Sequence, residues 1–144
     1  MTNLQSKAIN IKGKKYVLVS DRVLAFNEDF PKGCIETEMV SGADAQVVVF
    51  KAKVFPEGVG GRMFTGYSQA KWGEGYINTT SALENAETSA VGRALAFMGI
   101  GVIDTVASAD EVKKAISYPI KQPMRYVPKV SVTKEEMSKE EIPF

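Results

Sequence analysis

The 144-residue sequence contains no histidine and only one cysteine, Cys34. Without histidine, neither Ser-His-Asp nor Cys-His catalysis is possible in its usual form, and the commonest transition-metal ligand is missing. A single cysteine excludes an intrachain disulfide framework and a multi-cysteine zinc site. We therefore expect a protein that is not an enzyme and that uses no cofactor or metal.

The sequence also lacks long apolar runs. No stretch approaches the roughly 20 apolar residues that a membrane-spanning helix needs, and the first ten residues, MTNLQSKAIN, contain no apolar core of a secretion signal. Hydrophobic residues make up 44% of the chain, which is enough for one domain with a core. We therefore expect a cytoplasmic protein without a membrane partner.

A strong overall charge is missing as well, because 18 basic and 17 acidic side chains give a net charge of +1. The distribution is nevertheless uneven. Residues 133–144 hold two lysines and four glutamates, a balance of −2, so the preceding residues carry a balance of +3. A mildly basic body with an acidic tail is typical of nucleic-acid binders whose tail has a separate role, although many neutral enzymes share such a body.

Alternation of apolar and polar residues predicts most of the secondary structure. It predicts a strand or short hairpin at 8–19 and three further strands, at 34–40, 45–55 and 62–72. The clearest strand is 45–55. Its apolar residues at 48, 50, 52 and 54 point to one face, whereas Lys51 and Lys53 point to the other.

Helical spacing is strongest at 81–101, where the apolar stripe consists mostly of alanine. Ser81 and Glu84 form a capping-box pattern at its start, and Gly99 is placed to end it. An alanine stripe predicts that this helix lies close to its sheet. Two shorter helices are predicted, at 20–31 and 108–116.

These elements predict an α+β fold. An antiparallel β-meander of three to four strands is backed by one long helix and followed by a short second helix. Three of the six prolines lie at 119–128, just before the charged run. We therefore divide the chain into a folded domain at 1–117, a proline-rich linker at 118–132 and a disordered acidic tail at 133–144.

Cationic and aromatic side chains recur on the predicted elements in an arrangement that suits a single nucleic-acid strand. Lysine and arginine bind phosphates, and aromatic rings stack on bases. The candidate DNA-binding residues are Arg22, Lys51, Lys53, Arg62, Lys71, Trp72 and Arg93. On composition alone the simpler interpretation is stronger: the cations are ordinary solvated side chains, and Trp72 is a core or edge residue.

A metal-dependent nuclease is a minor alternative. Glu36 and Glu38 alternate on one predicted strand face, and Lys51 and Lys53 follow on the next strand. Paired acids near a lysine can hold Mg²⁺ and orient a water molecule. However, a Glu-x-Glu pair is also common on the polar face of a strand, and no third acid is placed to join it.

Two segments together resemble the single-strand annealing proteins, which comprise the phage Sak-type recombinases and the ring-forming eukaryotic annealing mediator. These segments are KYVLVSDRVLAFNEDFPKGCIETEMV, at 15–40, and NTTSALENAETSAVGRALAFMGIGV, at 78–102. The shared elements are a strand leading to Arg-Val and a short helix, a three-stranded meander, and a long helix with an Arg-Ala-Leu core. The resemblance covers roughly residues 14–105.

The resemblance implies a protein that is not hydrolytic, that forms rings or filaments, and that holds DNA in a positive groove between the sheet and the long helix. Arg93 matches the basic position in the Arg-Ala-Leu part of that helix. Gly92 and Ala96 stand where some relatives have further basic residues, which thins the expected positive charge.

The last six residues, KEEIPF, resemble the acidic terminus of bacterial single-stranded DNA-binding proteins. In those proteins the terminal phenylalanine enters an apolar pocket on replication and repair enzymes. The resemblance implies that Ile142, Pro143 and Phe144 bind a partner enzyme, with the glutamates steering the encounter. The alternative is an acidic solubility tail that happens to end in phenylalanine.

The leading hypothesis is a phage protein, located in the host cytoplasm, that binds single-stranded DNA and promotes annealing during recombination, replication or repair. We expect it to form a homo-oligomer and to recruit enzymes through its tail. The alternative from another class is a plain single-stranded DNA-binding protein with an OB-fold. That fold requires two further strands after the long helix, at 101–132.

Overall fold

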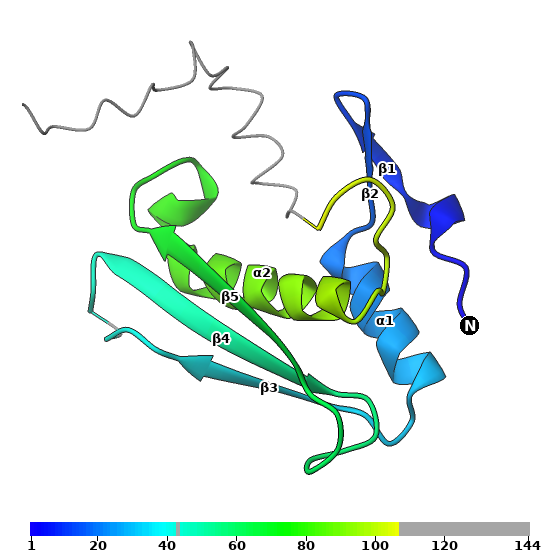
Figure 1. Cartoon of the computed structure of the whole chain (residues 1–144). Coiled ribbons are helices and arrows are strands. Elements are labelled where there is room, and N and C mark those ends of the chain that lie inside the picture. Colours follow the sequence, from blue (N-terminus) through cyan, green and yellow to red (C-terminus); the bar gives the residue numbers. More distant parts are fainter. Residues whose placement is uncertain (43, 107–144) are drawn as a thin grey trace, which may run out of the picture.

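The computed structural model describes residues 1–42 and 44–106. Two antiparallel sheets and two α-helices form the fold, which confirms the predicted α+β class (Figure 1). The elements in chain order are the 3-10 turn η1 (Gln5–Lys7), β1 (Ile9–Ile11), β2 (Lys14–Tyr16), α1 (Val19–Asp29), β3 (Cys34–Met39), β4 (Val47–Phe55), β5 (Phe64–Lys71), the 3-10 turn η2 (Ile77–Thr79) and α2 (Ala82–Phe97). The predicted helix at 108–116, the linker and the tail lie outside the described residues.

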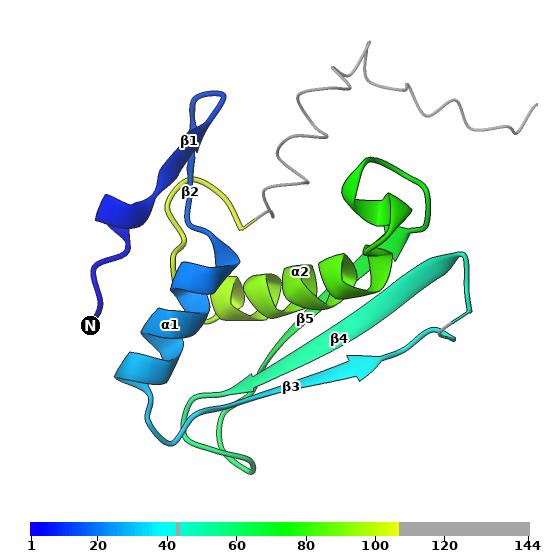
Figure 2. The ribbon, with the colours of Figure 1, turned by 180° about the vertical axis from the view of Figure 1, so that it is seen from behind.

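The three predicted meander strands are present, in the order β3-β4-β5, and the predicted N-terminal hairpin forms a separate sheet from β1 and β2. Figures 1 and 2 show α2 crossing one face of the three-stranded sheet, with α1 beside one end of α2 and the β1–β2 hairpin next to α1. No helix in the described ranges has the length and apolarity that a membrane crossing requires.

The core lies between α2 and the inner face of the sheet. The alternation predicted for β4 is confirmed, because its inner side chains Val48, Phe50, Ala52 and Val54 are all buried. Helix α2 contributes an alanine at every fourth position, which keeps one narrow stripe of small side chains against the sheet. The residues of this stripe, all buried, are Ala82, Ala86, Ala90 and Ala94.

Helix α2 approaches β5 most closely at Gly66. A Cβ atom built on Gly66 would lie 2.5 Å from both the carbonyl oxygen of Ala90 and the amide nitrogen of Ala94. Both of these are backbone atoms of the helix, so no side-chain rotation can relieve the contact. The backbone of α2 therefore rests directly on the backbone of β5, as the alanine stripe predicts.

The two ends of α2 match their sequence signals to different degrees. Ser81 occupies the N-cap position, but its side chain makes no capping hydrogen bond, so the predicted capping box with Glu84 does not form. At the other end Gly99 has a φ of +98°, and the amides of Gly99 and Ile100 donate to the carbonyls of Ala96 and Leu95. This pair of hydrogen bonds is a Schellman motif, and it confirms that Gly99 ends the helix.

Arg22 joins α1 to both of its neighbours from inside the protein. Only 2% of its surface is exposed. Its Nε donates to the Val17 carbonyl at 3.0 Å and its Nη1 to the Gly92 carbonyl of α2 at 3.2 Å, while the guanidinium lies 5.1 Å from the centroid of the Tyr16 ring. Burial lowers the pKa of Arg22, and the nearby Tyr16 partly offsets this effect. The guanidinium thus gives the Val17 carbonyl a donor and adds a second hydrogen bond to the Gly92 carbonyl, which lies within the hydrogen-bonded helix α2.

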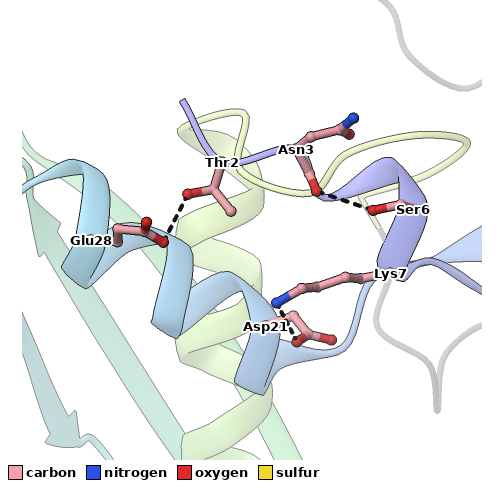
Figure 3. Close-up of polar contacts among 6 residues, drawn as sticks. All are labelled: Thr2, Asn3, Ser6, Lys7, Asp21 and Glu28. Carbon is pink, nitrogen blue, oxygen red and sulfur yellow. Dashed lines mark hydrogen bonds and ion pairs between the residues drawn. The ribbon is translucent and has the colours of Figure 1, made fainter.

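The N-terminal segment is attached to the outside of α1 (Figure 3). The amide of Thr2 donates to Asp29 Oδ2 at 3.0 Å, and its hydroxyl, with one proton, lies within donating distance of Glu28 Oε2 at 3.2 Å and Asp29 Oδ1 at 3.1 Å. The hydrogen bond from the Thr2 amide lowers the pKa of the Asp29 carboxyl. Near the start of the same helix, Asp21 lies 3.6 Å from Lys7 Nζ.

The contact at Gly66 predicts a large effect of a very small substitution. Gly66→Ala adds one methyl group against the α2 backbone and should lower the free energy of unfolding by about 2–3 kcal/mol. Denaturant unfolding followed by circular dichroism measures the change. The matched control is Ser68→Ala, two residues further along the same strand, for which we expect a change of about 0.5 kcal/mol or less. Equal midpoints for the two variants would contradict the close packing.

Replacing Arg22 tests its role as an internal donor. Arg22→Met keeps much of the apolar volume but removes the donor of the Val17 carbonyl and the hydrogen bond that links α1 to Gly92 of α2, so the free energy of unfolding should fall by about 2–4 kcal/mol. Arg62→Met, at an exposed position, is the control, with an expected loss of about 1 kcal/mol or less. A stable Arg22→Met protein would show that neither hydrogen bond is needed to hold α1 in place.

Candidate nucleic-acid interface

The outer face of the β3-β4-β5 sheet carries charged and polar side chains from all three strands. Side chains alternate along each strand, so the residues that do not face α2 all point to the opposite side. No other described element covers this side of the sheet (Figures 1 and 2). The backbone groups between neighbouring strands are hydrogen-bonded to one another, while the side chains on the outer face remain available to a ligand.

The strand register places a glutamate, a lysine and a tyrosine in one row across the outer face. Glu38 of β3 lies opposite Lys51 of β4, which in turn lies opposite Tyr67 of β5. The Lys51 ammonium is 5.5 Å from the centroid of the Tyr67 ring, and 52% of the Tyr67 surface is exposed. This row combines a cation with an accessible aromatic ring, which is the pairing that phosphate and base require.

A second row lies two residues further along, with Glu36 opposite Lys53 and Lys53 opposite Thr65. Within the described residues, neither Glu36–Lys53 nor Glu38–Lys51 comes to ion-pair distance. Both acids belong to β3 and both lysines to β4, so the outer face has an acidic edge and a basic centre. A polyanion is therefore favoured over β4 and β5 and disfavoured over β3.

Lys71 and Arg62 lie towards the two ends of this face. Lys71 is exposed at the end of β5, opposite Val47. Arg62 is exposed in the β4–β5 loop, with its guanidinium 4.7 Å from the centroid of the Phe64 ring. Because a strand rises about 3.3 Å per residue, the stretch of β4 from Val47 to Lys53 spans about 20 Å. The cations are thus spread over a length that matches only a few nucleotides.

Of the predicted DNA-binding residues, Arg22 is buried and Trp72 packs partly against the core. Trp72 is half-buried, shares the inner side of β5 with Ala70, and packs against the core under α2. Its amide donates to the Gln46 carbonyl at 3.0 Å, which extends the ladder beyond the strand. Arg22 is buried and bonded to two carbonyls, as described above. We therefore omit both residues from the interface, because neither presents its polar or aromatic surface to a strand on the outer face.

Arg93 lies on α2, and therefore on the covered side of the sheet, away from Lys51 and Lys53. Its guanidinium carbon is 5.5 Å from the centroid of the Phe97 ring, which is half exposed. The space between α2 and the sheet is filled by the alanine stripe and the inner side chains of β4. The candidate cations thus lie on two separate surfaces, the outer face of the sheet and the flank of α2. A nucleic-acid strand cannot pass between α2 and the sheet to reach both.

Gly92 and Ala96, the two positions at which the annealing-protein resemblance would have allowed basic residues, are both buried. A Cβ atom on Gly92 would lie 2.5 Å from Cγ2 of Val19 in α1. The crossing of α1 over α2 therefore leaves no room for a long side chain at Gly92.

Two exposed tyrosines were missed as candidates in the sequence. Tyr67 belongs to the outer face through its register with Lys51, and Tyr76 lies in the loop after β5 with 95% of its surface exposed. The pattern Tyr67-x-x-x-Lys71, which places both side chains on one face of a strand, was a readable signal for the first. For Tyr76 the flanking Gly73 and Gly75 signal only a loop.

The acids proposed for a nuclease are present on the outer face. Glu36 and Glu38 point to the same side of β3, and each lies opposite a lysine. Across residues 1–42 and 44–106, no group of three or more histidine, cysteine, aspartate or glutamate side chains is arranged to hold a metal ion. The two carboxylates instead set the acidic edge of the face.

A family model described as the Slr1353 N-terminal dsRNA-binding domain-like family matches residues 23–98. This is just over half of the chain, and it extends from within α1 to the end of α2, so it includes the whole three-stranded sheet. The description gives coarse support for a nucleic acid as the partner of the domain. A comparison with curated proteins finds no match. The chain therefore belongs to the Slr1353 N-terminal dsRNA-binding domain-like family.

Proposed function

We propose that this protein binds single-stranded DNA on the outer face of the β3-β4-β5 sheet and promotes the pairing of complementary strands. The observation that carries the proposal is the open row of Lys51 and Tyr67, flanked on the same face by Lys53 and Lys71. Lysines on a sheet hold the phosphates of one strand, and an exposed ring stacks on a base at about 1–3 kcal/mol. An open face leaves the Watson–Crick edges of the other bases free to pair.

Several copies of the chain would act together on one strand. A face of about 20 Å contacts only a few nucleotides, so one subunit supplies a small part of the binding free energy. Among the described residues, β3 and β5 each pair with β4 alone, and both leave one edge open. Repeated subunits along a strand, as a ring or filament, would add these small contributions by raising the effective concentration.

The physiological setting that fits this activity is phage recombination, replication or repair in a bacterial host. This part of the proposal rests on the resemblance of residues 14–105 to the Sak-type annealing proteins and on the acidic segment that ends in Ile142, Pro143 and Phe144. In this proposal Arg93 remains a candidate DNA contact on the separate α2 flank. The tail would recruit a replication or repair enzyme.

A second candidate function is binding of double-stranded RNA, which the family description favours. Domains that recognise duplex RNA contact phosphates and 2′-hydroxyls by shape, so they also use exposed lysines. Stacking distinguishes the two functions. An exposed Tyr67 ring suits an unpaired base, whereas a duplex offers no base face to it.

The sheet lysines provide the direct test. The double variant Lys51→Gln and Lys53→Gln should weaken binding of a labelled single strand about tenfold at ~100 mM salt and flatten the logarithmic salt dependence by about 1–1.5. It should also slow the pairing of two dye-labelled complementary strands. Fluorescence anisotropy and energy transfer measure the two effects.

The matched control changes the acids opposite these lysines. Glu36→Gln with Glu38→Gln should leave single-strand affinity equal or higher, because two negative charges are removed from the edge of the face. Wild-type binding of a strand without faster pairing would mean a protective coat. Tight binding of duplex RNA with no measurable binding of single-stranded DNA would favour the second candidate and reject the first.

The tail is tested separately from the DNA-binding face. Phe144→Ala should leave single-strand affinity unchanged, because the proposed DNA contacts lie in other parts of the chain. It should abolish co-purification of replication or repair enzymes from a host extract, identified by mass spectrometry. Met137→Ala, an apolar truncation within the same tail, is the control. Equal recovery of partners by both variants would show that the terminal aromatic is not the anchor.

A further inference from the structure

The β1–β2 hairpin and the turn before it carry four lysines within nine residues. Lys7, Lys12, Lys14 and Lys15 are all exposed. The hairpin precedes the stretch that the family model matches, and none of its lysines belongs to the outer face of the three-stranded sheet. The hairpin is therefore a second basic feature, distinct from the proposed single-strand site.

The strand register spreads these cations around the tip of the hairpin. Ile11 pairs with Lys14 and Asn10 with Lys15, so Lys14 and Lys15 point to opposite faces of the ribbon. Between them Lys12 and Gly13 have φ values of +46° and +90°, as in a type I′ turn, and Asn10 Oδ1 accepts the Gly13 amide at 2.7 Å. The tip thus carries a cation on each face and a third in the turn.

The base of the hairpin packs against other described residues, while Lys12, Gly13 and Lys14 at its tip are exposed. Ile11 and Tyr16 are buried, and the Arg22 guanidinium packs on the Tyr16 ring. The Lys15 amide donates to Asp104 Oδ2 at 2.7 Å, which ties β2 to the segment after α2. In Figures 1 and 2 the hairpin points away from α1, on the side of α2 that is remote from the open sheet face.

Nearby acids leave most of this charge uncompensated. Asp21 pairs with Lys7, and Asp104 approaches the backbone of Lys15. In the part of the chain that the structure describes, the ammonium groups of Lys12, Lys14 and Lys15 form no ion pair. The tip therefore places the positive charges of Lys12, Lys14 and Lys15 close together above a packed base. Such a cluster attracts a polyanion.

We infer that this hairpin binds double-stranded DNA, the product of the proposed annealing reaction, by entering the major groove. The groove is about 12 Å wide and about 8.5 Å deep, and it admits a two-stranded β-ribbon. Its walls are two phosphate backbones. Lys14 and Lys15 would each face one wall, with Lys12 at the leading turn.

The arrangement favours a duplex over a single strand for two reasons. A single strand has one backbone, so it cannot contact cations on both faces of the ribbon at once. In addition, the only aromatic ring in the hairpin, Tyr16, is buried, so the tip offers no surface on which an unpaired base can stack. Single strand and duplex would therefore bind on different sides of the same subunit.

The test uses the full chain with Lys12→Asn, Lys14→Gln and Lys15→Gln. Asparagine suits the positive φ at position 12, and the other two positions are exposed, so the thermal midpoint should match that of the wild type. Affinity for a labelled DNA duplex should fall at least about tenfold at ~100 mM salt, and the logarithmic salt slope should flatten by about 2–3. Affinity for the single strand of the same sequence should change less than about twofold.

The reciprocal control is Lys51→Gln, Lys53→Gln and Lys71→Gln, which also removes three charges but should weaken mainly the single strand. This inference rests on the proposed function, yet the two can fail separately. A wild-type protein that binds no single strand rejects the proposed function, while the hairpin variant still reports on the duplex. An unchanged duplex affinity, or an equal loss for both ligands, would overturn the hairpin site.

Discussion

The direct contact between the backbones of α2 and β5 is the constraint on which the rest of the structure depends. It requires glycine at position 66 on the strand and alanine at every fourth position on the helix. Small residues bury less apolar area than large ones, and burial of apolar area is the main source of stability. They allow the two backbones to pack closely along the length of the contact. The result is that α2 covers most of the inner face of the sheet, with Phe26 of α1 completing the same core. The outer face needs no cover and keeps its polar side chains.

Helix α1 is held in place by a different interaction, that of the buried Arg22 side chain. Arg22 reaches from α1 to a carbonyl on each side, and Gly101 leaves space beside it, since a Cβ atom at Gly101 would lie 3.1 Å from Arg22 Cγ. Burial of a guanidinium is costly unless its donors are satisfied. The two carbonyls and the Tyr16 ring supply partners, and Tyr16 also ends β2. One interaction thus sets both the crossing of the helices and the direction of the N-terminal hairpin.

Local patterns predicted the elements well, because each depends on residues close together in the chain. The alternation in β4, the alanine stripe of α2 and the stop at Gly99 were all confirmed. Ser81 was correctly placed at the helix start, yet its backbone angles of −136° and 38° keep its side chain from capping. The predictions that concern residues beyond 106 stay predictions.

The site was harder to predict, because it depends on register and long-range partners. Arg22 looks like any helical cation until a carbonyl 70 residues away is placed beside it. For Trp72 the sequence offered both a DNA contact and a core or edge position, and its place beside Ala70 on the inner side of the strand fits the second. The row of Lys51 and Tyr67 follows only from the pairing of β4 with β5, which the sequence of either strand alone does not specify.

A net charge of +1 limits the ways in which this protein could bind a nucleic acid, the class of partner that its family description supports. The chain as a whole exerts little long-range attraction on a polyanion, and exposed cations are screened beyond about 8–10 Å at physiological salt. Binding must therefore come from local arrangements in which acids are kept to one side, as on β3, or engaged with the backbone, as at Asp104. Each arrangement supplies few contacts. Under the proposed function, affinity for a long strand would come from repetition of the subunit, and the open edges of the sheet would then matter as much as its lysines.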